Sequence, residues 1–259
     1  MWRCTQYDDF DDLEQSASVA DAGLAEDVFR HLRLRILNGE FAGGDKLREL
    51  TLAKEMAVSR ATIREATRRL SGAGLLDINP QRGVFVRTFS LKEIEDLYEL
   101  RETLCDLIGR RFTERAGPAD MAHIRTLYDM TASVREGNYK PTDYIKALAF
   151  SEAVIRATYN EKLFELYHAS WQQFRLFKIH LIRTIQKGFE VKSYNKTLFF
   201  SGATVRQELM AGVAASDPVQ IRQAMLHATA ASRDGTRDLH AAYDFAIRSD
   251  WRGSNARWA

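Results

Sequence analysis

The sequence predicts a mainly α-helical protein in two parts, a small N-terminal part with one β-hairpin and a larger all-helical remainder. Two observations predict this. Residues 21–89 alternate helical periodicity with turn signals and end in a stretch of alternating apolar and polar residues, whereas residues 90–250 contain almost no strand pattern. A length of 259 residues with 45% hydrophobic side chains is sufficient for two cores.

The N-terminal part divides into three expected helices and a hairpin. Apolar residues recur at every fourth position over 24–38, and Gly39 ends this helix. The glycine-rich "GEFAGGDKL" follows as a turn, and "RELTLAKEMA" predicts a short second helix. After the break "AVS", Ser59 is placed to cap a third helix, "RATIREATRRLSGAG", and "LLDINPQRGVFVRTF" predicts the hairpin. Three helices with a tight break before the third, followed by a hairpin, form a winged helix-turn-helix.

The third helix concentrates positive charge. "SRATIREATRRL", residues 59–70, holds four arginines and one glutamate, and Arg60, Arg64 and Arg68 share one face at a spacing of four. A solvated basic face is the simplest interpretation of such a run. In a winged helix-turn-helix, however, this helix enters the DNA major groove, where the planar fork of arginine pairs with guanine edges or phosphates. The position of the arginines therefore predicts DNA binding.

Residues 90–250 read as six helices around a core with aromatic stripes, expected near 91–116, 118–136, 141–158, 160–187, 195–215 and 218–246. The acidic start, residues 1–20, is expected to be a disordered arm, and residues 251–259 a tail.

Several classes of protein are excluded by composition. No apolar run approaches the length of a membrane span, and the acidic beginning is unlike a secretory signal, so a cytoplasmic protein is expected. The two cysteines, Cys4 and Cys105, cannot form a disulfide framework, and Cys105 is expected to be a small core residue. There is no phosphate-binding glycine loop and no Ser-His-Asp or Cys-His signature, so we do not expect an enzyme.

The stretch "LRLRILNGEFAGGDKLRELTLAKEMAVSRATIREATRRLSGAGLLDINPQRGVFV" resembles the DNA-binding domain of GntR-type bacterial transcription regulators. The pair Gly43-Gly44 replaces the Pro-Gly of the family pattern. The helical remainder is similar to the FadR branch in its VanR-like form, with a helical ligand-sensing (FCD-type) domain. The resemblance implies a homodimeric, metabolite-responsive regulator, expected to be a repressor, that binds an inverted-repeat operator.

The family's DNA contacts can be transferred by position. The resemblance implies that Arg60 reads a base, that Arg64 also contacts DNA, and that Gly83 at the wing tip lets the backbone approach the minor groove. Glu65 is expected to orient arginine side chains or to pack the domain, because DNA would repel it. The residues assigned to DNA are Arg48, Ser59, Arg60, Thr62, Arg64, Arg68, Arg82 and Gly83.

The sensing part departs from its relatives, many of which bind a divalent metal through one Asp and three His. The four corresponding positions hold Ala147, Ser151, Arg206 and Ala228, and His227 lies one residue from the last of them. None of these four suits a metal, so neither a metal nor another cofactor is expected. The remaining candidates, His123, His168 and His180, lack a ligand spacing and are expected to be surface or core residues.

An arginine at a former ligand position suggests a different chemistry. Arg101 matches a family pocket residue, and Arg206 could supply the positive charge that a metal supplies elsewhere. The hypothesis is that Arg101, Ser151 and Arg206 bind a small carboxylate effector. The alternatives are that Arg206 is a surface residue or forms an interdomain ion pair, that the protein is a DNA-binding dimer without an effector, or that the sensing domain binds a divalent metal after all.

Overall fold

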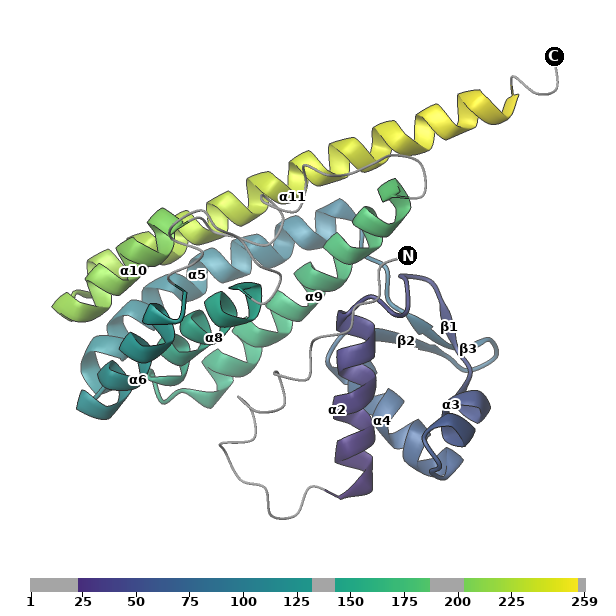
Figure 1. The fold of residues 1–259 in the computed structure, drawn as a ribbon, viewed down its shortest axis with the longest axis horizontal. Coiled ribbons are helices and arrows are strands. Elements are labelled where there is room, and N and C mark those ends of the chain that lie inside the picture. Colours follow the sequence, from purple (N-terminus) through teal and green to yellow (C-terminus); the bar gives the residue numbers. More distant parts are fainter. Residues whose placement is uncertain (1–22, 132–142, 187–202, 256–259) are drawn as a thin grey trace. The chain divides into compact units, whose positions relative to one another are not determined.

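The computed structural model describes residues 23–131, 143–186 and 203–255, so the expected acidic arm and Cys4 lie outside the described residues. The chain divides into two compact units (Figure 1). The first unit comprises residues 1–90 together with 171–187, and the second comprises 91–170 and 188–259. No helix in the described part of the chain combines the length and apolarity that crossing a membrane requires.

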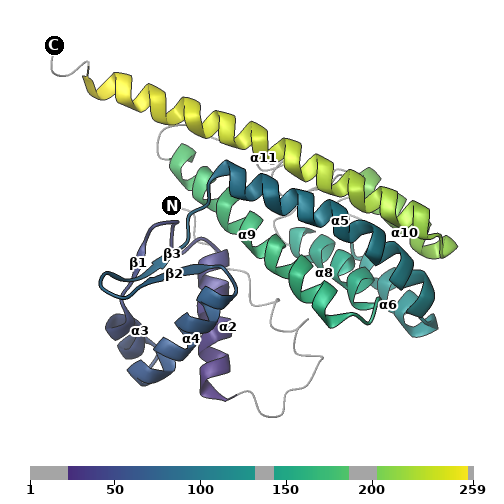
Figure 2. The same ribbon diagram turned by 180° about the vertical axis from the view of Figure 1, so that it is seen from behind.

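The first unit is a helix-turn-helix followed by a wing (Figure 2). Its elements are α2 (Leu24–Leu37), β1 (Lys46–Leu47), α3 (Glu49–Glu55), α4 (Arg60–Gly72), β2 (Leu76–Asn79) and β3 (Gly83–Val86). The strands form an antiparallel sheet in the order β1-β3-β2. The predicted hairpin is confirmed, and Asn79 pairs with Gly83 at its tip. Strand β1 was expected to be part of a turn, because two residues are too few for an alternating pattern.

A single apolar core holds the first unit together. Leu32 and Ile36 of α2 and Ile63 and Leu70 of α4 are completely buried, and Val86 of the wing joins them. Each helix thus turns its apolar stripe inward, and the polar face of α4 remains at the surface.

The second part of α9 (Glu161–Gln186) belongs to the first unit. Leu176 is 1% exposed and is part of the same core. Arg183 donates through Nη1 to the carbonyl oxygen of Gly39, at the turn that follows α2. The core of the first unit is therefore completed by a segment distant from it in the sequence.

The second unit is all helical. It contains α5 (Leu91–Arg115), α6 (Pro118–Asp129), α8 (Asp143–Arg156), the beginning of α9, α10 (Ala203–Ala215) and α11 (Pro218–Asn255). Helices α5 and α11 lie side by side and run antiparallel (Figures 1 and 2). Phe112 and Phe150 are among its largest buried side chains, and Cys105 is completely buried, as expected.

Two helix ends differ from the sequence-based expectation. α6 ends at Asp129 instead of near residue 136. α11 continues to Asn255 instead of ending near residue 246, so residues 251–255, which were expected to belong to a tail, are helical. The fold class itself, a winged helix-turn-helix followed by an all-helical part, is the one that the sequence predicts.

Candidate nucleic-acid interface

The turn between α3 and α4 sets the position of the arginine-bearing helix. Ala57 adopts a left-handed conformation, with φ of 54°, and the amide of Val58 donates to the carbonyl oxygen of Ala53 at 3.0 Å. The predicted cap is confirmed, because the amide of Thr62 donates to Ser59 Oγ at 3.1 Å. Ser59 and Thr62 also share a hydroxyl–hydroxyl hydrogen bond of 2.8 Å. Both side chains therefore fix the first turn of α4.

The faces of α4 separate as its periodicity predicts. Ile63 is buried, whereas the side chains of Arg64 and Arg68 are 63% and 74% exposed, and Arg60 is also exposed. Arg69 lies on a different face, with its guanidinium 4.4 Å from the Phe29 ring centre. Three of the four arginines of α4 thus form a row on its exposed face, while the fourth contacts α2.

Two carboxylates lie beside this row of arginines. Arg64 Nε donates to Glu49 Oε2 at 3.2 Å, and Arg68 Nη2 donates to Glu65 Oε2 at 2.5 Å. The second contact confirms the expectation that Glu65 orients an arginine. The contact between Glu49 and Arg64 joins α3 to α4 and could not be predicted from local spacing, because the two residues are fifteen positions apart.

The wing is shaped by its turn. Asn79 Oδ1 accepts hydrogen bonds from the amides of Gln81 and Arg82, at 3.1 and 3.2 Å. Gly83 follows with φ of 104°, a conformation that disfavours any side chain. The turn therefore leaves the Arg82 side chain exposed at the tip.

Lys46 is a further cation at the wing. It pairs with Phe85 across β1 and β3, and its Nζ lies 5.7 Å from the Phe85 ring centre. Its Cε lies 3.0 Å from the position that a Cβ on Gly83 would occupy. The position of Lys46 at the wing could not be predicted, because its stretch of sequence reads as a turn. Arg48, which was assigned to DNA, is exposed at the N-terminus of α3, two residues further along the chain.

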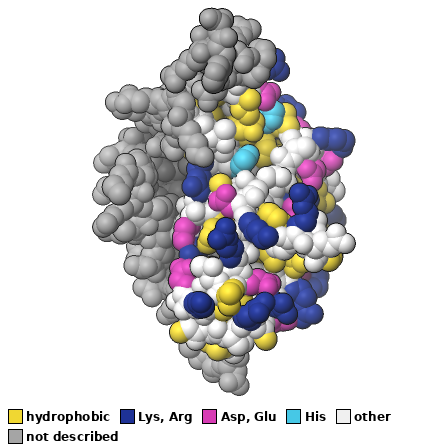
Figure 3. Space-filling model, turned by 90° about the vertical axis from the view of Figure 1, so that its right-hand side faces the viewer, with side chains coloured by type: hydrophobic (Ala, Val, Ile, Leu, Met, Phe, Trp, Pro, Cys, Tyr) yellow, Lys and Arg dark blue, Asp and Glu magenta, His cyan; other side chains and the backbone are white. Residues whose placement is uncertain are grey.

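Charges of both signs are interspersed on one face of the molecule. Figure 3 shows one face of the molecule, on which dark-blue Lys and Arg side chains lie among magenta Asp and Glu side chains and do not form an unbroken patch. A continuous basic surface would favour any polyanion equally, whereas interspersed carboxylates limit the positions at which a phosphate backbone can approach.

The residues assigned to the effector lie on three helices of the second unit. Arg101 of α5 is 8% exposed, lies 4.0 Å from the Tyr167 ring centre and donates to the Tyr167 hydroxyl. Ser151 of α8 donates to the carbonyl oxygen of Ala147 in its own helix, at 3.1 Å. Arg206 of α10 is 2% exposed, so the alternative that it is a surface residue is wrong. Of the contacts just described, none connects one of the three to another.

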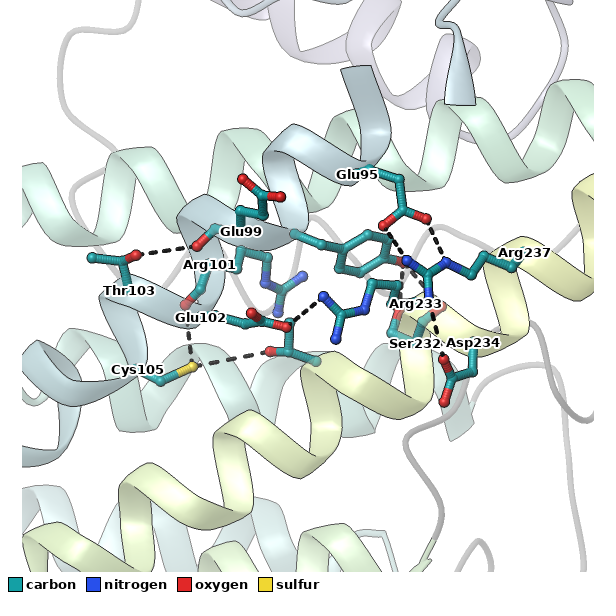
Figure 4. A network of polar contacts seen from close by, with 12 residues as sticks. Glu95, Glu99, Arg101, Glu102, Thr103, Cys105, Ser232, Arg233, Asp234 and Arg237 are labelled. Atoms are coloured by element: carbon teal, nitrogen blue, oxygen red, sulfur yellow. Dashed lines mark hydrogen bonds and ion pairs between the residues drawn. The ribbon is translucent and has the colours of Figure 1, made fainter. Parts of the chain in front are cut away.

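A polar network extends from Arg101 along α5 and α11 (Figure 4). Its contacts are Glu95 with Arg237, Tyr98 with Ser232 and Thr236, Glu102 with Arg233, and Cys105 with Thr229. Burial raises the pKa of the Tyr167 phenol and of the Cys105 thiol, so both are neutral at physiological pH. The network therefore holds the first and last helices of the second unit together through neutral and oppositely charged pairs.

Two histidines of the second unit each lie beside a carboxylate. His168 Nδ1 lies 2.6 Å from Glu152 Oε1, and His227 Nδ1 lies 2.8 Å from Glu208 Oε2. Among the described residues, no three His, Cys, Asp or Glu side chains are grouped as metal ligands.

The fold and the row of arginines define the first unit as a winged helix-turn-helix of the kind that binds nucleic acid. Residues 24–86 match the family described as "Bacterial regulatory proteins, gntR family". The match covers the same residues as the winged helix-turn-helix, from the beginning of α2 to the end of β3.

Three proteins that are similar to this chain are informative about its fold and its class. The HTH-type transcriptional regulator YdhC of Bacillus subtilis (strain 168), which is described as uncharacterized, is 27% identical over 136 residues, or 52% of this chain and 61% of that protein. The HTH-type transcriptional repressor RspR of Escherichia coli (strain K12) is 31% identical over 86 residues, or 33% of this chain and 38% of that protein. The structure of E. coli McbR/YncC superposes with a TM-score of 0.66 at 17% identity, covering 86% of this chain and 99% of that one.

The third comparison supports the fold over both units. The first two match only part of each relative, and both names describe regulators rather than enzymes. These names agree with the expectation that this chain is not an enzyme.

Proposed function

We propose that this protein is a transcription regulator that recognises a specific DNA sequence through its first unit. The observation that carries the proposal is the exposed row of Arg60, Arg64 and Arg68 on α4, beside a wing with Lys46 and Arg82. The row can enter the major groove while the wing contacts the adjacent backbone or minor groove. The name of the relative RspR supports a repressor.

Further parts of the proposal rest on the family resemblance. The DNA-binding domain would span residues 21–89 and the sensing and dimerisation domain residues 90–250. A homodimer would place two copies of α4 on the two halves of an inverted repeat, in the cytoplasm where the DNA lies. Light scattering on the full chain tests the dimer, and a monomeric mass with operator bound would contradict it.

DNA recognition is tested by selection from a random duplex library, followed by gel-shift titration of the enriched sequence. Arg60→Ala should weaken binding by about 1–3 kcal/mol and relax the preference at one base pair. Thr103→Ala, an exposed substitution on α5, is the matched control and should change neither quantity. Unchanged affinity and preference in Arg60→Ala would refute this assignment.

We further propose that the second unit binds a small carboxylate through Arg101, Ser151 and Arg206. Two guanidinium groups in the interior of a helical bundle offer charge-assisted hydrogen bonds in a low-dielectric environment, where such bonds to a carboxylate are strong. Binding would then shift the population of the dimer toward a state with weaker affinity for DNA.

This proposal is tested by thermal-shift screening of mono- and dicarboxylic acids, with release from the operator as the second measurement. Arg206→Ala should abolish both responses, and full retention of the response would refute the role of Arg206.

Elemental mass spectrometry of protein purified without affinity-tag nickel tests the metal alternative. A stoichiometric transition metal would overturn the metal-free proposal.

A DNA-binding dimer without an effector is the second candidate. The contacts of Arg101 with Tyr167 favour it, because they give this buried cation a structural role. Operator binding that no carboxylic acid changes would support this candidate over the first.

A further inference from the structure

We propose that Glu49 is a positioning residue for DNA recognition, which holds the Arg64 guanidinium so that its terminal fork is presented to a base pair. The inference rests on the proposed DNA-binding function. It adds a carboxylate, which DNA would repel, to the residues that determine sequence preference.

The side chains of Glu49 and Arg64 differ in their exposure to solvent, and this difference suits the proposed role. Glu49 is the first residue of α3 and its side chain is 23% exposed, whereas the Arg64 side chain is 63% exposed. A carboxylate at the first turn of a helix is stabilised by the helix dipole. Glu49 is therefore the anchored partner, and Arg64 is the partner that extends toward solvent.

The atoms involved decide what Arg64 can still do. A guanidinium has two edges that can each form paired hydrogen bonds, one through Nε and one Nη atom and one through both Nη atoms. Glu49 Oε2 accepts from Nε, at 3.2 Å. Arg64 makes no other ion pair within the described part of the chain, so its Nη1–Nη2 edge can pair with O6 and N7 of guanine.

Arg68 provides a contrast on the same helix. Its Nη2 atom, which is shared by both edges, donates to Glu65 Oε2 at 2.5 Å. The contact of Arg68 therefore uses a nitrogen of the terminal edge, whereas the contact of Arg64 uses Nε, which lies outside that edge. Of these two arginines, Arg64 is therefore the better placed to read a base, and Arg68 is suited to a phosphate.

Removing a positioning carboxylate should raise the affinity for DNA of any sequence and lower the preference for the correct base pair. Its negative charge lies close to the path of the phosphates, so removing it should strengthen binding to all sequences. Its removal also frees the Arg64 side chain to adopt many rotamers, so the correct base pair should lose part of its advantage. A residue that only stabilises the fold would weaken both kinds of binding together.

The experiment uses the full-length chain and a random duplex library. The wild-type protein first selects an operator, and Arg64→Ala identifies the base pair at which preference depends on Arg64. Glu49→Gln and its matched control Glu65→Gln are then titrated on that operator. They are also titrated on three altered operators, each of which carries one of the other base pairs at this position. Thermal unfolding establishes that each variant is folded.

We expect Glu49→Gln to reduce the preference at this base pair about three- to tenfold, part of the discrimination that a bidentate contact provides. We also expect it to bind unrelated DNA more tightly than wild type. Glu65→Gln should tighten binding to unrelated DNA while leaving the preference at this base pair unchanged. In a Glu49→Gln/Arg64→Ala double variant, the loss of preference should be no larger than in Arg64→Ala alone.

If Glu49→Gln does not fold, Glu49→Asp retains the charge on a shorter side chain and should reduce the preference at the same base pair. A folded Glu49 variant that keeps the wild-type preference, or that weakens binding to all sequences equally, overturns the assignment. If the wild type enriches no sequence at all, the proposed function fails and the assignment fails with it. Enrichment by the wild type with an unaffected Glu49 variant overturns the assignment alone.

Discussion

The Nε atom of Arg175 donates a hydrogen bond of 2.6 Å to the main-chain carbonyl oxygen of Leu37. Leu37 is the last residue of α2, and the carbonyl groups at the end of a helix lack partners within that helix. Arg175 is 7% exposed, and its Nη2 atom also donates to Asn38 Oδ1 at 3.3 Å. A cation from α9 therefore caps the C-terminus of α2, where the helix dipole favours positive charge.

Arg175→Ala should destabilise the first unit by about 2–3 kcal/mol, because it removes charge-assisted hydrogen bonds and leaves a buried carbonyl group without a partner. Hydrogen exchange of the α2 amides and urea unfolding are the measurements. Lys162→Ala, at the exposed beginning of the same helix, should change stability by no more than about 0.5 kcal/mol. Equal effects of the two substitutions would contradict the capping role.

Two neighbouring glycines at the end of α4 should respond oppositely to alanine. Gly74 has φ of 74°, and an added Cβ would lie 2.6 Å from Gln173 Nε2, so Gly74→Ala should cost about 1–2 kcal/mol. Gly72 is helical and an added Cβ would meet nothing within 4 Å, so Gly72→Ala should be neutral or stabilise by up to about 1 kcal/mol. Thermal unfolding of both variants checks the difference, which should vanish if residue 74 can relax without strain.

Two substitutions of Ser59 can distinguish its role as a helix cap from a role in DNA binding. Ser59→Ala should destabilise the first unit by about 1 kcal/mol, because the Thr62 amide loses its acceptor. Ser59→Asp retains an acceptor and should keep most of the stability, but its charge should weaken DNA binding. Unfolding experiments and gel-shift titration measure the two effects. Strong DNA binding by Ser59→Asp would mean that this end of α4 lies away from the phosphates.

The stability of the first unit should depend on the protonation of His180. Burial lowers the pKa of the His180 imidazole below its ordinary value of 6.5, although the nearby Asp45 opposes this shift. The unfolded chain therefore binds a proton more readily than the folded chain does. The contribution is fully present above about pH 6.5 and is lost as the pH falls from there through the lower, folded pKa.

The measurement for His180 is thermal unfolding between pH 8 and pH 5 in wild type and in His180→Gln. The variant should lose less stability on acidification than wild type does. Parallel curves for the two proteins would show that the folded and unfolded chains bind the proton at His180 equally well.

Much of the local structure could be predicted because it depends on neighbours in the chain. The cap at Ser59, the buried Ile63 and the exposed Arg60 follow from the 3.6-residue period and from the turn before α4. The hairpin follows from alternation around a turn sequence. Strand β1 could not be predicted, because Lys46 and Leu47 form a strand only by pairing with β3.

The candidate site likewise has features that could be predicted from the sequence and features that could not. The position of the arginines on α4 is a property of one helix and can be read from their spacing. The different contacts of Arg64 and Arg68 depend on Glu49 in another helix and on side-chain conformation. The burial of Arg206 could not be predicted from the sequence either, because a single cation in a helical pattern can face either solvent or a neighbouring helix.

Local sequence was thus enough for the class of fold, for the helix that carries the arginines and for the wing beside it, since periodicity, capping and turn chemistry act over a few residues. Three features required the folded chain: the inclusion of residues 171–187 in the first unit, the capping of α2 by Arg175 and the pairing of Glu49 with Arg64. Each joins segments that the sequence keeps apart. An apolar stripe or a charge indicates that a partner is needed, and only the packing of the chain selects which partner it is.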